Sequence, residues 1–449
     1  MKILIVGGGG REHAICWKLA KSPRKPRLFC APGNAGTGQL ATNVNIPAHD
    51  IGALLDFARA ERIDLTIVGP EEPLCAGIVD RFAAAGLRIF GPTAAAARLE
   101  GDKAFAKQLM REAGVPTAEA RIFGPTAQEI AQTRQAGKGR DEAASASFQT
   151  GYDMARHYVA TRDEGIVVKA SGLAKGKGVF VHPEPYAALE TLERLMVKRE
   201  LGDAGMRVVI EEMLIGQEVS VLALVDGNNI YVLEAACDHK RLGEQDTGPN
   251  TGGMGAFSPT TALTENDLEI IEKDVFVPVI DALRRDEIIY QGVLYAGLIM
   301  TAAGPKVLEF NCRFGDPETQ PILMRLQGDL LEAVEATIDG RLDQIELQWD
   351  RRAAVCVVMA SGGYPGEYKK GYEITGLAEA SALPDVQAFH SGTSLADEKV
   401  VTAGGRVLGV TGIADTIQHA RERAYAATRL ISFKGAYFRG DIAMQASNR

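Results

Sequence analysis

Residues 1 to about 100 alternate between short apolar runs and segments with a helical period, and this alternation constrains the fold most. The run from Ile3 to Val6 has the composition of a buried strand, and glycines and the helical pattern REHAICWKLAKS follow it. Further strands are expected at residues 28–31, 65–68 and 88–90, each followed by a turn that contains Gly or Pro. Alternation of this kind predicts a parallel, doubly wound sheet.

Glycine-rich turns follow the first two of these strands. A glycine turn in front of a helix can seat a phosphate, because free N–H groups and the helix dipole both point at it. The dinucleotide-binding fingerprint G-x-G-x-x-G is not met, since its third glycine position falls on Glu12 or His13. Glycines needed only for backbone reasons are an equally weighted alternative for each turn. Candidate ligand residues after these strands are Gly8, Gly9, Gly10, Asn34, Gly36, Thr37 and Glu71.

The size and charge of the chain bound the remaining possibilities. With 449 residues and 48.0 kDa it is too large for one ordinary core, so about three domains are expected. A net charge of −9 argues against a broad nucleic-acid-binding surface. Six scattered cysteines without a C-x-x-C pair indicate reduced, mostly buried thiols, and neither a disulfide framework nor a zinc site. No signal peptide or membrane span is recognised, so we expect a cytoplasmic protein without nucleic-acid or membrane partners.

A lysine-bearing hairpin is the first candidate for phosphate binding. Strands are expected at 166–170 and 178–182, joined by a turn rich in Gly and Lys, and Lys169 lies inside the first, otherwise apolar strand. A buried strand tolerates a lysine only where an anion meets it or its amine reaches solvent. With Lys175 and Lys177 in the turn, we interpret the hairpin as a flexible cover over phosphates; a charged hairpin tip is the alternative.

Two further stretches could contribute to a nucleotide site. A helical pattern covers residues 93–113 and contains Lys103, for which a solvated surface position is the simpler explanation in isolation. Residues 207–226 predict two strands joined at 213–216. An extended apolar linker of this kind can take adenine, and the nearby carboxylate of Glu218 can hold ribose hydroxyls.

The stretch VLEFNCRFGDPETQ, residues 307–320, carries a candidate metal site. It begins as a short strand, which places Glu309 and Asn311 on the same face. A carboxylate and an amide oxygen, with no His or Cys nearby, suit a hard cation such as Mg²⁺ (or Mn²⁺). Arg313 follows and could contact a phosphoryl or carboxylate group. On these residues alone, an edge strand with a solvated polar face is the favoured alternative.

Several other segments are assigned from pattern. Residues 238–259 are interpreted as a long loop between a strand and a helix, and residues 134–153 as an insertion or a mobile loop. Helices are expected at 268–283 and 327–338, and a small α+β region with a helix at 416–430 ends the sequence.

Two lysines on a hairpin, an adenine-sized linker, a ribose-type carboxylate and a Glu/Asn pair together outline an ATP–Mg²⁺ site between two α+β subdomains. On these and further motifs the chain resembles the glycinamide ribonucleotide synthetase (phosphoribosylamine–glycine ligase) family of the ATP-grasp superfamily. Eleven motifs occur in order: GGGGREHA, APGNAGT, VGPEEPL, IFGP, LEGDKAFAK, VVKASGLAKGKGV, DHKR, DTGPNTGGMGA, LEFNCRFGDPETQPILMRL, ASGGYPG and FRGDI.

The resemblance implies an α/β and α+β multidomain protein. Its parts would be a Rossmann-like substrate domain at 1–101, an ATP-grasp domain at 102–331 with a mobile lid at 118–190, and a small α+β domain at 332–449. The implied reaction is the ATP-dependent ligation of glycine to 5-phosphoribosylamine through glycyl phosphate, an early step of purine biosynthesis. ATP and Mg²⁺ (or Mn²⁺) would be the cofactors, and the chain would act as a monomer or weak homodimer.

The resemblance also implies roles by position. The ATP phosphates would face Lys103, Lys169 and Lys177, and catalysis would use Lys177 and Arg313, the latter steadying the acyl phosphate. Adenine would meet the backbone of Glu211, Glu212, Met213 and Leu214, with Glu218 on the ribose. The metal would be held by Glu309 and Asn311. Phosphoribosylamine would meet Gly8, Gly9, Gly10, Asn34, Gly36, Thr37 and Glu71, and the ammonium of glycine would meet Asp238 or Asp316.

The sequence departs from the family pattern in the lid. Ser171 stands where an acidic residue is usual, Lys175 stands where an uncharged one is usual, and extra residues occur around 137–155. These departures bear on lid closure and ATP affinity. The alternatives are another purine-pathway ATP-grasp ligase acting on a ribonucleotide, a nucleotide-binding oxidoreductase, which the failed fingerprint disfavours, and a non-catalytic ATP sensor.

Overall fold

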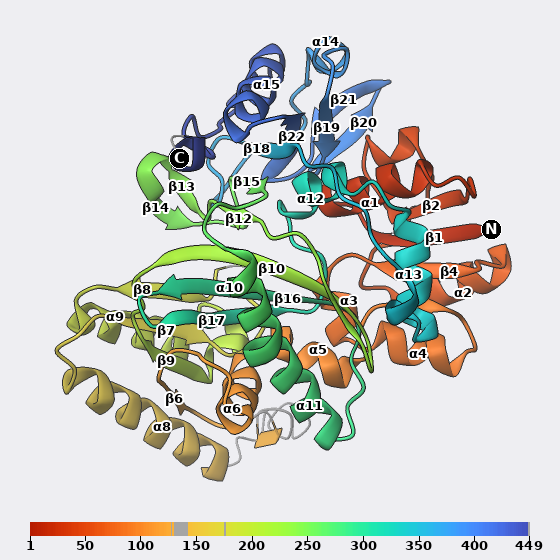
Figure 1. Ribbon diagram of the computed structural model, residues 1–449. Coiled ribbons are helices and arrows are strands. Elements are labelled where there is room, and N and C mark those ends of the chain that lie inside the picture. Colours follow the sequence, from red (N-terminus) through yellow and green to blue (C-terminus); the bar gives the residue numbers. More distant parts are fainter. Residues whose placement is uncertain (127, 130–141, 175–176, 448–449) are drawn as a thin grey trace. The chain divides into compact units, whose positions relative to one another are not determined.

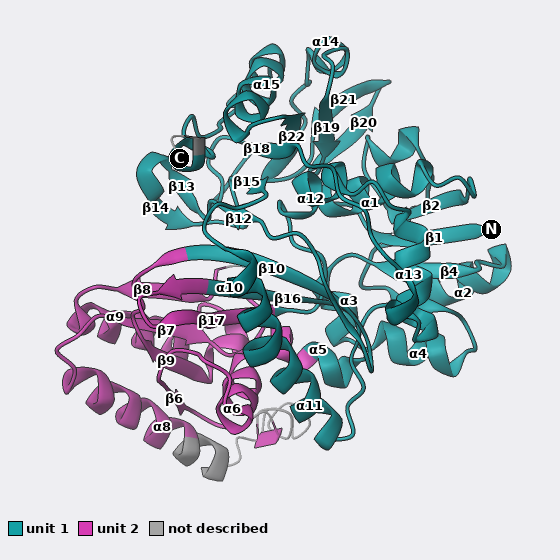
Figure 2. Ribbon diagram, in the orientation of Figure 1, with its two compact units in different colours: residues 1–97, 218–298, 311–449 teal, residues 98–217, 299–310 magenta. Residues whose placement is uncertain are grey.

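The structure is a computed structural model that describes residues 1–126, 128–129, 142–174 and 177–447. The chain divides into two compact units (Figure 2). Unit 1 comprises residues 1–97, 218–298 and 311–449, and unit 2 comprises residues 98–217 and 299–310.

Unit 1 begins with a parallel sheet of strand order β3-β2-β1-β4-β5 (Figure 1). The central strands β1 and β4 are mostly apolar, and every residue of the two except Lys2 is buried, as expected where helices cover both faces of a sheet. The predicted doubly wound sheet is therefore confirmed. Its elements are β1 (Lys2–Gly7), α1 (Gly10–Ala20), β2 (Arg27–Pro32), β3 (Thr42–Asn43), α2 (Ile51–Glu61), β4 (Leu65–Val68), α3 (Glu71–Cys75), α4 (Ile78–Ala84), β5 (Ile89–Phe90) and α5 (Ala94–Gly101).

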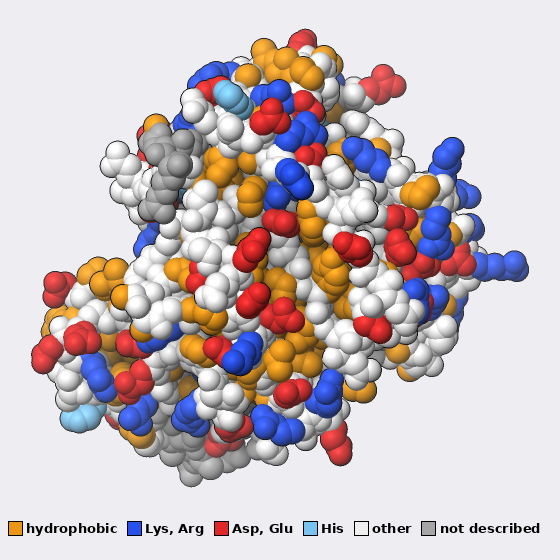
Figure 3. Space-filling view, viewed as in Figure 1, with side chains coloured by type: hydrophobic (Ala, Val, Ile, Leu, Met, Phe, Trp, Pro, Cys, Tyr) orange, Lys and Arg blue, Asp and Glu red, His pale blue; other side chains and the backbone are white. Residues whose placement is uncertain are grey.

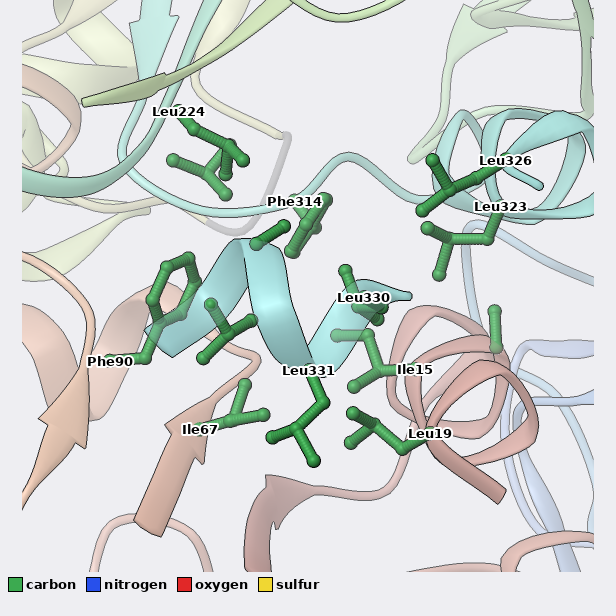
Figure 4. Packing of buried hydrophobic residues seen from close by; sticks show 14 of the residues in the cluster. Ile15, Leu19, Ile67, Phe90, Leu224, Phe314, Leu323, Leu326, Leu330 and Leu331 are labelled. Atoms are coloured by element: carbon green, nitrogen blue, oxygen red, sulfur yellow. The ribbon is translucent and has the colours of Figure 1, made fainter. Parts of the chain in front are cut away.

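A large hydrophobic core of unit 1 lies where helices from distant parts of the sequence meet this sheet (Figure 4). Leu19 of α1 and Ile67 of β4 belong to the same cluster as Leu331 of α13 (Leu330–Asp339), and each of these side chains is fully buried. Helix α12 (Thr319–Arg325) adds Leu323, and it also packs against α1. This core fixes the turns at the carboxyl ends of β1, β2 and β4.

A second sheet of unit 1 is antiparallel, with the order β12-β15-β18-β22-β19, and helix α15 packs against it (Figure 1). Its central strand β18 is buried along its whole length. The elements of this region are β12 (Cys237–Asp238), β15 (Gly255–Ser258), β18 (Ala353–Ala360), α14 (Leu377–Ser381), β19 (Val386–His390), β20 (Thr393–Ala396), β21 (Lys399–Thr402), β22 (Arg406–Ala414), α15 (Ile417–Leu430) and α16 (Met444–Ser447).

A two-stranded ribbon of β13 (Arg241–Gly243) and β14 (Thr247–Asn250) leaves this sheet and is fastened by a buried arginine. The side chain of Arg439 is 1% exposed and donates to the carbonyl of Arg241 at 3.0 Å and to the carboxylate of Asp246 at 2.8 Å. The same guanidinium forms a two-point ion pair with Asp441, with both N–O distances at 2.8 Å. The carboxylate of Asp441 in turn accepts the N–H of Gln245 at 2.8 Å. The ribbon is therefore held by residues almost two hundred positions later in the sequence.

Unit 2 contains an antiparallel sheet of order β6-β9-β7-β8, with helices α8 and α9 packed on it (Figure 1). Val168, Leu192 and Ile210 are fully buried between these layers. The elements are α6 (Lys103–Ala113), β6 (Ala120–Phe123), α8 (Glu142–Ala160), β7 (Ile166–Ala170), β8 (Val179–His182), α9 (Ala188–Leu192) and β9 (Val208–Glu212).

The remaining strands and helices lie between residues 217 and 311. They are β10 (Gln217–Asp226), β11 (Ile230–Val232), α10 (Glu265–Ile271), α11 (Val277–Arg285), β16 (Gln291–Thr301) and β17 (Gly304–Asn311). The multidomain α/β and α+β fold class is thus confirmed, whereas the domain boundaries at 101 and 331 stay predictions.

Three expected helices have different bounds in the structure. The helix expected at 268–283 extends from Glu265 to Arg285, and a π-helical turn at Glu272–Phe276 separates α10 from α11. The helical pattern at 93–113 is broken at Asp102, whose side chain accepts the N–H of Phe105 at 3.2 Å and so starts a new helix, α6. The helix expected at 327–338 begins only at Leu330, because Asp329 caps it by accepting the N–H of Leu331 at 3.0 Å. Helix α12, which precedes it, was not predicted.

Two expected loops contain regular structure. In the segment 134–153, helix α8 begins at Glu142, so the prediction of a loop is wrong from that residue on; residues 134–141 lie outside the described part. The segment 238–259 contains the ribbon and strand β15, which pairs with β18. That pairing joins residues about one hundred positions apart and leaves no local signal.

On the face seen in Figure 3, acidic and basic side chains are intermixed. Within the described ranges, every helix is either too short or too polar to cross a membrane. All six cysteines are free thiols and all but Cys75 are buried, as expected.

Candidate active site

Two lysines and one carboxylate are buried together in unit 2. The ammonium of Lys169 on β7 lies 2.9 Å from one oxygen of Glu211 on β9, and the ammonium of Lys107 on α6 lies 3.2 Å from the other. The side chain of Lys169 is 6% exposed, that of Lys107 is 5% exposed and that of Glu211 is 2% exposed. The prediction that a buried strand lysine needs a partner anion is confirmed for Lys169. Burial lowers the pKa of Lys107 to about 8, although the Glu211 carboxylate opposes that shift.

The same lysines also bind backbone oxygens of β17. Lys169 donates to the carbonyl of Leu308 at 2.8 Å. Lys107 donates to the hydroxyl of Thr117 at 2.5 Å, and that hydroxyl donates to the carbonyl of Val307 at 2.6 Å. The two carbonyl groups that these hydrogen bonds reach belong to the two residues directly before Glu309, the predicted metal ligand.

Lys103 is the first residue of α6 and lies beside Ser171. The Ser171 hydroxyl donates to the carboxylate of Asp102 at 2.7 Å and accepts the N–H of Ala104 at 3.1 Å, and its carbonyl accepts the N–H of Lys103 at 2.8 Å. An acidic residue in place of Ser171 would bring a second carboxylate against Asp102, so the serine suits this helix start. Within the described ranges, the Lys103 ammonium has no hydrogen-bond or ion-pair partner.

The hairpin turn is only partly described. Lys177 is exposed, whereas Lys175 and Gly176 lie outside the described residues. The interpretation of this turn as a cover over phosphates stays a prediction.

In the linker predicted to bind adenine, the backbone N–H groups of two residues already donate hydrogen bonds within the protein. The N–H of Glu212 donates to Glu119 and that of Met213 to Gly165, both at 3.0 Å. The N–H of Leu214 has no partner among the residues that the structure describes. The Glu119 N–H, followed by Lys306 at 3.1 Å, lowers the pKa of the Glu212 carboxyl. The backbone N–H of Leu214 is therefore available in this linker to donate a hydrogen bond to a ligand.

The candidate metal ligands lie on strand β17. Glu309 and Asn311 alternate with the buried side chain of Phe310 and are both half-buried. The amide oxygen of Asn311 accepts a long hydrogen bond of 3.3 Å from Arg313. No cluster of three or more His, Cys, Asp and Glu side chains with metal-site geometry occurs in the described part of the chain. Two oxygen donors without nitrogen or sulfur suit Mg²⁺, which usually keeps water and substrate phosphate oxygens in its shell.

In unit 1, the Glu12 carboxylate fills the first of the predicted glycine turns. Glu12 is 2% exposed and accepts the N–H of Gly9 at 2.5 Å. A Cβ atom on Gly7 or Gly69 would lie within 2.6 Å of an atom of the Glu12 side chain. Burial raises the pKa of the Glu12 carboxyl, and the positive charge of Arg11 opposes this rise. Gly7 therefore has a structural reason, as has Gly9, whose Cβ atom would lie 2.8 Å from the Glu12 carboxylate, and the N–H of Gly9 in the expected phosphate seat is already engaged.

The second glycine turn is held by its own polar side chains. Asn34 donates to the carbonyls of Gly8 and His390 at 3.0 and 2.8 Å, and Thr37 is fully buried. The backbone N–H of His390 also donates to Nδ1 of the His13 imidazole at 2.7 Å. Burial lowers the pKa of His13 to about 3 and that of His390 to about 4. The binding roles of Asn34, Gly36 and Thr37 stay predictions.

Glu71 lies at the start of α3 between two arginines. Its carboxylate is 3.5 Å from Arg313 and 3.6 Å from Arg11. Arg313, the predicted catalytic cation, thus has acidic and amide partners in this structure. The structure brings Glu71 and Arg313 together, although the sequence placed them in different roles.

Asp238 and Asp316 differ in their partners. Asp316 forms an ion pair of 3.0 Å with Arg406 and accepts from Gln320 at 2.7 Å. One carboxylate oxygen of Asp238 is buried and has no hydrogen-bond partner in the described structure. Burial, reinforced by the Glu318 carboxylate, raises the pKa of Asp238 well above its usual range. Of the two, Asp238 is the carboxylate that lacks a donor.

Glu218 is half-exposed and its carboxylate lies 2.7 Å from the ammonium of Lys240.

Several residues of the charged clusters described above were not predicted from the sequence. In the sequence, Lys107 resembles a surface lysine of an amphipathic helix, and no feature of the neighbouring residues indicates that it is buried. A charged residue at the start of an apolar strand is the signal that could have pointed to Arg406. The missed residues are Arg11, Glu12, Lys107, Lys240, Glu318 and Arg406.

Three family models match the chain. Residues 1–100 match the phosphoribosylglycinamide synthetase N domain, residues 138–319 the ATP-grasp (A) domain, and residues 354–445 the C domain of the same enzyme. Together they cover most of the sequence.

Curated relatives match over their full length. The chain is 48% identical to the phosphoribosylamine–glycine ligase of Caldanaerobacter subterraneus subsp. tengcongensis over 443 residues, which cover 99% of each chain. It is 46% identical to the ligase of Escherichia coli O157:H7 over 453 residues, which cover 100% of this chain and 99% of the relative.

Solved structures give the same result for the fold. The phosphoribosylamine–glycine ligase of Thermotoga maritima superposes with a TM-score of 0.78 at 32% identity, covering 99% of this chain and 100% of that one. An N5-carboxyaminoimidazole ribonucleotide synthetase in complex with ADP, at 16% identity and a TM-score of 0.63, covers 95% of this chain and 96% of its own, and shares the fold. The chain belongs to the phosphoribosylamine–glycine ligase family.

Proposed function

We propose that this protein joins glycine to 5-phosphoribosylamine with consumption of ATP, giving glycinamide ribonucleotide, ADP and phosphate in purine biosynthesis. The observation that carries this proposal is the 48% identity to a phosphoribosylamine–glycine ligase across 99% of both chains. The charged clusters described above supply the chemistry that such a reaction needs.

The ATP phosphates are assigned to Lys103, Lys169 and Lys177. Lys169 is supported by its fixed position in the buried cluster, and Lys103 by an ammonium without a partner in the described ranges. Adenine is assigned to the linker, where the N–H of Leu214 is available, and the ribose to Glu218. The bound nucleotide would compete with Lys240 for the Glu218 carboxylate.

Mg²⁺ is assigned to Glu309 and Asn311, with Mn²⁺ as a substitute. Their oxygen donors fit a hard cation, and the long hydrogen bond at Asn311 leaves its amide oxygen weakly engaged. When bound, the ion would neutralise phosphate charge and so favour phosphoryl transfer.

The reaction needs two steps, because a carboxylate is a poor electrophile. A carboxylate oxygen of glycine attacks the terminal phosphoryl group of ATP, forming glycyl phosphate and releasing ADP. The neutral amine of the sugar then attacks the acyl carbon, and phosphate leaves as the amide forms and the amine loses a proton. Holding the reactants in line contributes about 7–11 kcal/mol of barrier reduction at best. Arg313 and Lys177 are assigned to the charge that develops on the phosphoryl oxygens.

The ammonium of glycine is assigned to Asp238 in preference to Asp316. Asp316 is already neutralised by Arg406, whereas Asp238 has a buried oxygen without a donor. An ammonium would supply that donor and return Asp238 to its charged form. The phosphoribosylamine is assigned to the turns at Gly8, Gly9, Gly10, Asn34, Gly36, Thr37 and Glu71.

Phosphate release with ATP, glycine and phosphoribosylamine, each omitted in turn, tests the proposal. Release should require all three substrates at full rate. Hydroxylamine trapping separates the nearest rival, another purine-pathway ligase that acts on a ribonucleotide, because only glycyl phosphate yields glycine hydroxamate. Phosphate release that does not depend on glycine would refute the assignment. An oligomeric state no higher than a weak homodimer and a cytoplasmic location belong to the same proposal.

A further inference from the structure

Lys107 is a buried charged group to which the proposed reaction gives no role. Its ammonium shares the Glu211 carboxylate with Lys169, at 3.2 Å and 2.9 Å. A lysine exposed by only 5% is rare unless it is paired, and this one shares its partner with another lysine. The cluster therefore carries two positive charges and one negative charge in a place that water barely reaches.

The excess charge affects what Lys169 can do. If Lys169 and Glu211 were alone, the carboxylate would neutralise the ammonium and weaken its attraction for a phosphate. With Lys107 on the other carboxylate oxygen, the negative charge is shared and the cluster keeps a net positive charge beside Lys169. Interactions of this kind are strong because the site is poorly screened.

Lys107 also fixes backbone that leads to the predicted metal ligand. Its ammonium donates to Thr117, and the Thr117 hydroxyl donates to the carbonyl of Val307. Lys169 holds the next carbonyl, that of Leu308. The two lysines thus anchor consecutive residues of β17 directly before Glu309.

We propose that Lys107 is a positioning residue for the ATP-dependent step: it holds the Glu211 carboxylate in place, so that Lys169 stays oriented beside a cluster of net positive charge, and through Thr117 it fixes the strand that carries Glu309. This rests on the proposed function, which assigns Lys169 to ATP phosphates and Glu309 to the metal. Lys107 itself need not touch the substrate.

The charged groups around Lys107 allow a pH test. They are Glu211 and Glu212 on β9 and Lys169 on β7, with Lys306 of β17 paired to Glu212. The pKa of Lys107 is lowered to about 8, so its ammonium loses its proton within the working pH range. The ATP-dependent step should then decline above about pH 8, as the cluster loses its excess charge.

The experiment compares Lys107→Met, Lys107→Arg and a matched control, Lys18→Met. Lys18 is a lysine of unit 1 that is 9% exposed, has its pKa lowered by burial to about 8, and donates to the carbonyl of Leu326. Glycine hydroxamate formation from ATP, glycine and hydroxylamine is measured from pH 6.5 to 9.5, because this reaction needs no sugar amine. Thermal midpoints show the folded state of each variant.

Lys107→Met should lower kcat/KM for ATP by about 10- to 100-fold, the usual cost of losing a group that orients a ligand-binding residue. The KM for glycine should stay unchanged, and the decline above pH 8 should disappear. Lys107→Arg should retain most activity and also lose that decline, since arginine stays protonated. Lys18→Met should keep the wild-type pH profile.

A folded Lys107→Met enzyme with wild-type kcat/KM for ATP, or with the pH decline still present, would overturn the inference. If the wild-type protein formed no hydroxamate, the proposed function would fail instead. Calorimetric titration with magnesium and a non-hydrolysable ATP analogue would then decide the role of Lys107. A weaker Kd in Lys107→Met alone would support it, and equal Kd values in all variants would refute it.

Discussion

Replacing Glu211 with glutamine isolates the energetics of the buried lysine pair. In the wild-type protein the cluster holds two ammonium groups and one carboxylate, and all three side chains are at most 6% exposed. The variant keeps its shape but leaves two buried ammonium groups without a counter-ion. Removing one partner of a buried ion pair costs about 3–5 kcal/mol, because the remaining charge stays desolvated. For a folding unit close to the size of unit 2, which contains the cluster, a loss of 1 kcal/mol lowers the thermal midpoint by about 2–4 °C, so the midpoint of that unit should fall by about 6–20 °C.

The pH dependence and a second substitution make this prediction specific. Burial already lowers the pKa of Lys107 to about 8, and loss of the Glu211 carboxylate removes the main group that opposes this shift. The unfolded chain, in which a lysine has a pKa of about 10.4, therefore binds more protons over that interval. The stability of the variant should therefore recover as pH rises from 7 to 9. Adding Lys107→Met removes one of the two ammonium groups, so the double variant should be more stable than Glu211→Gln alone. A Glu211→Gln midpoint within about 2 °C of wild type at pH 7 would refute the reasoning.

Three other perturbations follow from the structure. The pKa of His13 is lowered to about 3 and that of His390 to about 4, below the unfolded value of about 6.5, so stability should fall as pH drops from 6.5 towards 3; a midpoint that is equal at pH 7 and pH 4.5 would contradict this. Leu331→Ala removes a fully buried side chain and should cost about 2–5 kcal/mol in denaturant unfolding, with wild-type stability as the contrary result. Glu309→Ala should lower kcat far more than the thermal midpoint, and removal of Mg²⁺ with EDTA should abolish the activity of the wild-type enzyme; near-normal turnover of the variant would disprove the metal assignment.

Local pattern predicts elements whose signal lies within the element. The strands expected at 65–68 and 166–170 match β4 and β7 residue for residue, because each is a short apolar run closed by a turn. The helical pattern at 93–113 fails at Asp102, where a side-chain cap overrides a continuous periodicity. Strand β15 escapes prediction because its partner β18 lies about one hundred residues away.

The residues of the candidate site also fall into those that local sequence could predict and those that it could not. Lys169 could be singled out because a lysine is unusual inside an apolar strand, and Glu211 proves to be its anion. Lys107 could not, because its place on an amphipathic helix resembles that of a solvated lysine until β9 is packed against it. The glycines before α1 were expected to serve a ligand, yet a side chain on Gly9 would meet the Glu12 carboxylate and one on Gly8 would meet the backbone of Gly33, so packing already explains these two glycines.

The fastening of the ribbon by Arg439 has a consequence for how this protein is made. Synthesis proceeds from the amino end, so the ribbon leaves the ribosome long before its ties, which come 196 residues later in the case of Gln245 and Asp441. Loss of Arg439 and Asp441 would release a segment that lies almost two hundred positions earlier in the sequence. A lesion at these two residues is therefore as damaging to the ribbon as a lesion within it.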